Sequence, residues 1–141
     1  MPGPRRIVLD TNVLISALLS PHGAPAQVLD LVLAGELTAL LDDRIAAEYR
    51  AVAGRPRFGF APADVGRVLD AVARFGEHVA ARPLDVVLPD VDDLPFLEVA
   101  AAGRADALVT GNLRHFAPAH GTHAVVVYSP RALLDALRGD A

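Results

Sequence analysis

Acidic side chains at three separated points of the chain are the residues most able to do chemistry. Asp10 directly follows an apolar run, Glu48 lies inside a helical pattern, and residues 90–93 contain three aspartates. Carboxylate oxygens from separate elements are hard ligands, which suit Mg²⁺ or Mn²⁺ better than zinc. A cation held by such groups can lower the pKa of a bound water and steady the charge on a phosphate. The pattern therefore favours metal-assisted chemistry on a phosphate group.

Two of these points have simpler interpretations, which the residues alone leave open. Asp10 can be a plain N-terminal cap of the next helix. The run Asp90-Val91-Asp92-Asp93 can be a solvated acidic turn in which one residue caps a helix. Three acids in four residues nevertheless exceed what capping needs, and their mutual repulsion favours a bound cation.

Glu48 is the more informative acid because of its helical neighbours. Ile45, Tyr49 and Val52 are spaced i, i+4, i+7 and predict a buried stripe. Glu48 lies on the same stripe, and an inward-facing carboxylate is costly unless it is paired or bound to a metal. The alternative is a glutamate at the edge of the stripe that snorkels to solvent or pairs with an arginine.

The elements that position these acids alternate between strand-like and helical patterns. Short apolar runs predict strands at 7–9, 37–41, 107–110 and 124–128, with a further strand-like run at 86–88. Helical patterns cover 11–19, 26–33, 42–52, a stretch around 65–72, 94–102 and 130–138. We expect Thr11 or Asn12 to cap the first of these helices. Because no hairpin turn signal separates the strands, we expect an α/β fold with a parallel sheet covered by helices on both faces.

Ligands of open α/β sheets bind beyond the carboxyl ends of the strands. Asp10, the aspartates of 90–93 and the run Thr110-Gly111-Asn112 all follow predicted strands. The topology therefore brings them to one edge of the sheet.

Length and composition exclude several other classes of protein. The 141 residues suit one domain over 1–141, and 52% of them are hydrophobic, which argues against disorder. The absence of cysteine excludes disulfides, a thiolate zinc site and a cysteine nucleophile. The five histidines have no HExxH-type spacing, so we expect no histidine metal site, and no phosphate-binding P-loop motif is present. Neither a membrane-spanning run nor a signal peptide is evident, which predicts a cytoplasmic protein.

The formal net charge of −4 requires any nucleic acid to meet a local basic patch or bound cations. The loop 54–60 is the candidate patch: Arg55 and Arg57 can bind phosphates, and Phe58 or Phe60 can stack on a base. The alternative is a hinge whose phenylalanines complete the core.

Four motifs in this order resemble a PIN domain, and more narrowly the toxin components of type II toxin–antitoxin systems. They are Asp10-Thr11-Asn12, Glu48-Tyr49-Arg50, Asp90-Val91-Asp92-Asp93 and Val109-Thr110-Gly111-Asn112. The stretches 16–21 and 112–116 fit the same branch, and the match runs from about residue 5 to residue 137.

The resemblance implies a PIN-like three-layer α/β/α sandwich and an endoribonuclease that depends on Mg²⁺ or Mn²⁺. It implies an RNA substrate, a cognate antitoxin partner and a homodimer. Carried over by position, Asp10, Glu48 and Asp93 are the catalytic, metal-holding residues, and Asp90 is a further metal ligand. The residues that line the site are then Thr11, Asn12, Asp92, Thr110 and Asn112. One departure concerns Asn112, where many PIN domains have an aspartate.

Two rival functions remain. A PIN-like module that binds RNA or protein without catalysis is favoured by Asn112, which carries no charge for a second metal. A haloacid-dehalogenase-like phosphatase also opens on a strand ending in aspartate, but it needs a second aspartate where this chain has Asn12.

Overall fold

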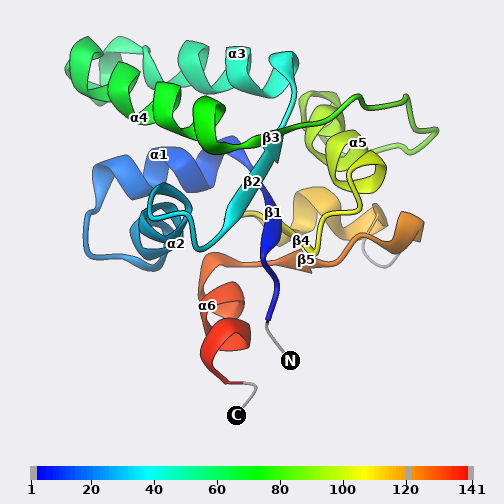
Figure 1. Ribbon diagram of the computed structural model, residues 1–141. Coiled ribbons are helices and arrows are strands. Elements are labelled where there is room, and N and C mark those ends of the chain that lie inside the picture. The colour runs from blue at the N-terminus through cyan, green and yellow to red at the C-terminus, as the bar shows by residue number, and fades with distance from the viewer. Residues whose placement is uncertain (1–2, 120–121, 140–141) are drawn as a thin grey trace.

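A five-stranded parallel sheet runs through the computed structural model, which describes residues 3–119 and 122–139 (Figure 1). The strands are β1 (Arg6–Leu9), β2 (Thr38–Leu41), β3 (Glu77–His78), β4 (Ala107–Val109) and β5 (Val127–Tyr128). Their order is β3-β2-β1-β4-β5, and every pair is parallel. β1 is central, with Ile7 paired to Ala39 on one side and to Ala107 on the other. Burial on both faces explains the continuous apolar sequence of this strand.

Helices cover both faces of the sheet. They are α1 (Thr11–Leu19), α2 (Ala24–Leu33), α3 (Asp43–Ala53), α4 (Pro62–Phe75), α5 (Leu94–Ala102) and α6 (Pro130–Arg138). Short 3₁₀ turns are η1 (Pro56–Phe58), η2 (Val91–Asp93), η3 (Leu113–Ala119) and η4 (Thr122–Ala124). α5 packs on β1, β2 and β4 from one side, whereas α1, α2 and α4 lie on the other (Figure 1). The predicted PIN-like three-layer α/β/α sandwich is therefore confirmed.

Two strand predictions and one capping prediction need correction. The run 86–88 is not a strand, because Val87 is 86% exposed and only Leu88 of the three is buried. The strand expected at 124–128 is confined to Val127–Tyr128. The N-cap of α1 is Asp10 rather than Thr11 or Asn12, yet the Asp10 side chain makes no capping hydrogen bond. Its carboxylate is therefore available for another role.

A buried glutamate joins α3 to α5. Glu98 is 7% exposed, and its Oε1 lies 2.7 Å from Nη1 of Arg44 at the start of α3. Its Oε2 accepts a hydrogen bond of 2.9 Å from the backbone N–H of Leu84. Arg44 also contacts Asp42, whose Oδ1 caps α3 by accepting from the N–H of Ile45. This network fixes the helix that carries Glu48 and the chain that leads into η2.

We expect Arg44→Ala to lower the free energy of unfolding by about 2–3 kcal/mol, because it leaves the buried Glu98 carboxylate without its counter-charge. The matched control is Arg67→Ala, which removes an ion pair to Asp64 whose side chains are 74% and 69% exposed. Exposed pairs of this kind contribute no more than about 1 kcal/mol. Urea unfolding of both variants measures the difference. Equal losses would show that the Arg44–Glu98 pair is no more important than a surface pair.

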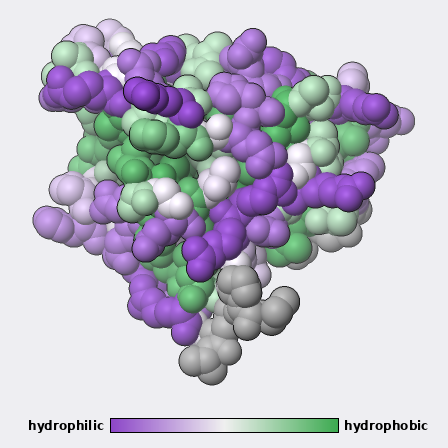
Figure 2. Space-filling view, viewed as in Figure 1, coloured by the Kyte–Doolittle hydropathy of each residue, from purple (hydrophilic) through white to green (hydrophobic). Residues whose placement is uncertain are grey.

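Hydrophobic side chains reach the surface around α1 and α2 (Figure 2). A hollow of about 390 Å³ lies between the end of α2, the start of β2 and the end of α4, lined among others by Val32, Leu33 and Phe75, and Phe75 is 63% exposed. No helix within residues 3–119 and 122–139 has both the length and the apolar composition needed to cross a membrane.

Candidate functional site

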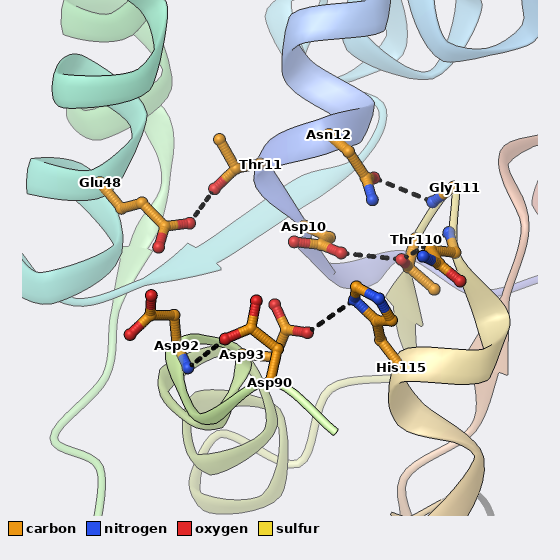
Figure 3. Close-up of polar contacts among 11 residues, drawn as sticks. Asp10, Thr11, Asn12, Glu48, Asp90, Asp92, Asp93, Thr110, Gly111 and His115 are labelled. Carbon is orange, nitrogen blue, oxygen red and sulfur yellow. Dashed lines mark hydrogen bonds and ion pairs between the residues drawn. The ribbon is translucent and has the colours of Figure 1, made fainter. Parts of the chain in front are cut away.

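A cleft of about 350 Å³ lies beyond the carboxyl ends of β1 and β4 (Figure 3). Its lining combines the acidic motifs with part of the loop 54–60, which we call the arginine loop. The lining residues are Asp10, Thr11, Asn12, Ile15, Ser16, Glu48, Val52, Arg55, Arg57, Phe58, Asp90, Asp92, Asp93 and His115. The structure thus brings together residues that stand up to 105 positions apart in the sequence, from Asp10 to His115. The edge of the parallel sheet makes this possible, because β1 and β4 are neighbours that end on the same side.

Asp10 is a buried carboxylate at the end of β1. It is 4% exposed, and its Oδ2 accepts a hydrogen bond of 2.8 Å from Oγ1 of Thr110. Burial raises the pKa of Asp10, and the hydrogen bond from Thr110 offsets part of that rise. The plain-cap interpretation fails, because the side chain points into the cleft and caps nothing.

Glu48 reaches the cleft from α3 and accepts a hydrogen bond from Oγ1 of Thr11. It is half-buried, in keeping with its place beside the stripe of Ile45 and Tyr49. The Tyr49 hydroxyl donates to the carbonyl oxygen of Leu9 over 2.6 Å, which ties α3 to the residue before Asp10.

The arginines of α3 have other partners. Arg44 pairs with Glu98, and Arg50 pairs with Asp70. Among residues 3–119 and 122–139 Glu48 forms no ion pair with an arginine, so the arginine-paired alternative is not what the structure has.

The three aspartates of 90–93 have different surroundings. Asp90 is exposed, and its Oδ1 accepts from the backbone N–H of Asp92 over 2.9 Å, so Asp90 is the cap of η2. Asp92 is exposed as well. Asp93 is 8% exposed, and burial together with the nearby charges of Asp10 and Asp90 raises its pKa to about 6. The run is therefore more than a solvated turn, since one of its carboxylates is held inside the cleft.

The raised pKa of Asp93 makes this carboxylate a source of instability in the metal-free protein. Below about pH 4 the group is protonated in both the folded and the unfolded chain. As the pH rises toward and through 6, the folded protein must ionise this buried acid. The stability that the protonated Asp93 side chain contributes at lower pH is therefore lost. In EDTA at pH 7.5 we expect Asp93→Asn to raise the free energy of unfolding by roughly 1–3 kcal/mol, and the gain should vanish near pH 4. Urea unfolding at both pH values tests this, with Asp92→Asn as the exposed control. A gain that does not depend on pH would contradict it.

The segment after β4 closes one side of the site. Thr110 is fully buried, and its Oγ1 accepts from the backbone N–H of Asn112 over 3.0 Å while donating to Asp10. Asn12 Oδ1 accepts from the N–H of Gly111 over 2.9 Å. Asn112 is half-buried and, unlike Asn12, is not among the residues that line the cleft. In this structure Asn112 supports the site through its backbone.

His115 is a cleft residue that the sequence motifs did not indicate. Its Nδ1 lies 3.1 Å from Oδ2 of Asp93, and together with Asp90 and Asp93 it offers ligand atoms within 4.8 Å of one another. A motif of paired histidines, such as HExxH, cannot indicate a single histidine in a site. Its signal was its place five residues after Thr110, directly before the apolar Phe116.

The arginine loop lies at the mouth of the cleft. Arg55 and Arg57 are exposed and line it, and the Arg57 guanidinium carbon lies 4.8 Å from the centre of the Phe58 ring. Phe58 stacks on Phe60 with ring centres 5.6 Å apart, and both pack against the core. The two arginines therefore line the cleft, as a phosphate contact requires. The two phenylalanines pack against the core, as the hinge interpretation requires.

The chain therefore combines a parallel α/β/α sandwich with a cluster of carboxylates at the carboxyl edge of its sheet. Residues 6–114 match the family model for the PIN domain, and the chain belongs to the PIN-domain family.

The chain is also similar to one curated protein and, in its fold, to one chain of a solved structure. The Uncharacterized protein MJ1680 of Methanocaldococcus jannaschii is 30% identical over 110 residues, which cover 76% of this chain and 70% of that protein. The crystal structure of VapBC2 from Rickettsia felis, bound to a DNA fragment from their promoter, contains a chain with the same fold. The TM-score is 0.59 at 16% identity, over 88% of this chain and 98% of that one.

Proposed function

We propose that this protein is a metal-dependent endoribonuclease and the toxin of a type II toxin–antitoxin pair. The observation that carries the proposal is the pair of buried carboxylates, Asp10 and Asp93, in one cleft with two exposed arginines. Membership of the PIN-domain family supports a nuclease, and the likeness to VapBC2 supports the toxin role.

The chemistry of the donor set fits Mg²⁺ or Mn²⁺. Asp10 and Asp93 are buried acids in one cleft, and the charge of Asp10 contributes to the raised pKa of Asp93. Buried like charges are costly, and a divalent cation between them would remove that cost. Glu48 and Asp90 line the same cleft and can complete an oxygen-rich ligand set. We propose Asp10, Glu48 and Asp93 as the catalytic and metal-holding residues, with Asp90 as a further ligand.

The chain's own side chains prepare the reaction. Thr110 donates to Oδ2 of Asp10 and so fixes the plane of that carboxylate. Thr11 does the same for Glu48. Arg55 and Arg57 can hold the phosphates that flank the scissile bond, and Phe58 offers an aromatic face to a base. Asp10, Glu48 and Asp93 would hold a divalent cation, whose Lewis acidity would serve to activate water and to offset charge on the phosphate.

Of the five residues proposed beside the ligands, Thr11, Asn12 and Asp92 line the cleft. Thr110 and Asn112 are proposed to support the site from behind Asp10 instead.

The experiment is cleavage of end-labelled RNA by the purified protein. We expect cleavage that EDTA stops and that Mg²⁺ or Mn²⁺ restores, with a DNA of matched sequence as the control. The second candidate function is a PIN-like module that binds RNA or protein without cutting, and Asn112 in place of an acid favours it. RNA binding with no cleavage at any cation concentration would establish that alternative and overturn the nuclease.

The proposed partners are an RNA substrate, a cognate antitoxin and a second copy of the chain. The likeness to a chain of VapBC2, which is bound to a DNA fragment from its promoter, supports an antitoxin here. Growth arrest on expression, relieved by the product of a neighbouring small gene, tests that partner. Light scattering tests the homodimer. We further propose a single domain over 1–141 that acts in the cytoplasm, where both RNA and antitoxin would be met.

A further inference from the structure

The imidazole of His115 contacts the buried carboxylate of Asp93 in the cleft. Its Nδ1 lies 3.1 Å from Oδ2 of Asp93, and the two side chains are 37% and 11% exposed. Figure 3 shows the ring on the side of the cleft opposite Glu48, turned toward the Asp93 carboxylate. The contact therefore joins η3 to the start of α5, across 22 residues of sequence.

The ring is presented by a segment that is fixed at both ends. Before it, the backbone N–H of His115 donates to the carbonyl of Asn112 over 3.1 Å, and the N–H of Asn112 donates to Oγ1 of Thr110. After it, Phe116 is fully buried and anchors η3 in the core. Since Thr110 also holds Asp10, the position of the imidazole is tied to that of the first carboxylate of the site.

The orientation of Asp93 is not set by the helix that it precedes. Asp93 occupies the N-cap position of α5, yet its side chain makes no capping hydrogen bond. Within residues 3–119 and 122–139, the hydrogen bond that orients its carboxylate comes from His115. One oxygen of Asp93 is engaged by the imidazole, which leaves the other for the cleft.

We propose that His115 is a positioning residue: its Nδ1–H donates to Oδ2 of Asp93 and directs the second oxygen of that carboxylate to the cation. The inference rests on the proposed function, because it assumes that the cleft holds a divalent metal. Carboxylates that bind metals are commonly oriented by such hydrogen bonds, and loss of the donor weakens metal binding about 10- to 100-fold. Because Nδ1 is engaged by Asp93, only Nε2 of this ring is left to bind a cation, and in this proposal Nε2 does not bind it.

The test measures Mn²⁺ affinity by electron paramagnetic resonance, without RNA. His115→Asn places an amide N–H near the position of Nδ1, whereas His115→Gln places one near Nε2, and His115→Ala removes both. We expect Ala and Gln to weaken Mn²⁺ binding about 10-fold, and Asn to stay within about threefold of the natural protein. His22→Ala, which removes an exposed histidine that does not line the cleft, is the matched control and should change nothing.

Recovery of Mn²⁺ affinity by Asn but not by Gln would separate positioning from a general packing role. If His115 only filled space, neither amide would be favoured over the other. Pulsed resonance of the natural protein should show no nitrogen bonded directly to Mn²⁺. Unchanged affinity in His115→Ala, equal rescue by Gln and Asn, or a directly bonded nitrogen would each overturn the inference while leaving the metal site intact. If the natural protein and Asp10→Asn bind Mn²⁺ equally, the proposed function fails instead, and the inference falls with it.

Discussion

Asp10→Asn is expected to reduce the rate of RNA cleavage by roughly 100-fold or more, since it removes the charge of the most deeply placed carboxylate of the cleft. Asparagine has almost the volume of aspartate, and its carbonyl oxygen can still accept the hydrogen bond from Thr110. The fold should therefore survive. Burial raises the pKa of Asp10, so the neutral variant should be no less stable than the natural protein in EDTA at pH 7.5.

Single-turnover cleavage at saturating Mn²⁺ measures the loss, and urea unfolding checks the fold. Asp135→Asn is the matched control, because Asp135 is an exposed aspartate on α6 that does not line the cleft. Full cleavage by the Asp10 variant would remove this residue from the site. A loss of cleavage that accompanies a loss of folding would be traced to structure and not to chemistry.

The double change Arg55→Ala and Arg57→Ala is expected to weaken RNA binding roughly 10-fold or more at 0.1 M salt, because each arginine can neutralise one phosphate. For single-stranded RNA, the loss of two contacts should also reduce the slope of log affinity against log salt by about 1.4. Phe58 and Phe60 stay in place, so the loop should keep its anchor on the core.

Fluorescence anisotropy with the cleavage-deficient Asp10→Asn protein measures the affinity over a range of salt concentrations. The control is Arg67→Ala with Arg74→Ala, which removes two exposed arginines from α4, away from the cleft. An unchanged salt slope in the loop variant, or an equal change in the control, would show that the loop does not contact phosphates.

Much of the fold follows from periodicity, because most elements bury one consistent face. The run Ile7-Val8-Leu9 predicted the central strand, and the spacing of Val65, Leu69 and Val72 predicted α4. β3 had no such signal, since Glu77 and His78 are both exposed and join the sheet through backbone pairing with β2 and an ion pair of Glu77 with Arg6 of β1. The run 86–88 had the opposite problem, because its three apolar residues form no strand and only Leu88 of them is buried.

The meeting of Asp10 and Thr110 was predictable for a topological reason, whereas the aspartates of 90–93 reach the cleft although the run before them is not a strand. Residues that follow neighbouring parallel strands must meet at one edge, and this brought Asp10 close to Thr110. Contacts made by single polar residues were not predictable in this way. Glu98 stands out as a lone charge within the apolar α5, but nothing in the sequence identifies Arg44 as its partner, 54 residues away. His115 was missed for the same reason.

The position of a bound cation in the crystal would show whether Asp10 and Asp93 hold a metal. Crystals of the protein grown with Mn²⁺ and measured near the manganese absorption edge would locate the ion by its anomalous signal. We expect a peak within about 2.2 Å of carboxylate oxygens of both Asp10 and Asp93, which disappears in Asp10→Asn crystals. The cleft could instead stay empty at Mn²⁺ concentrations that support RNA cleavage, or the peak could lie against other residues alone. Either result would show that Asp10 and Asp93 do not hold the catalytic cation.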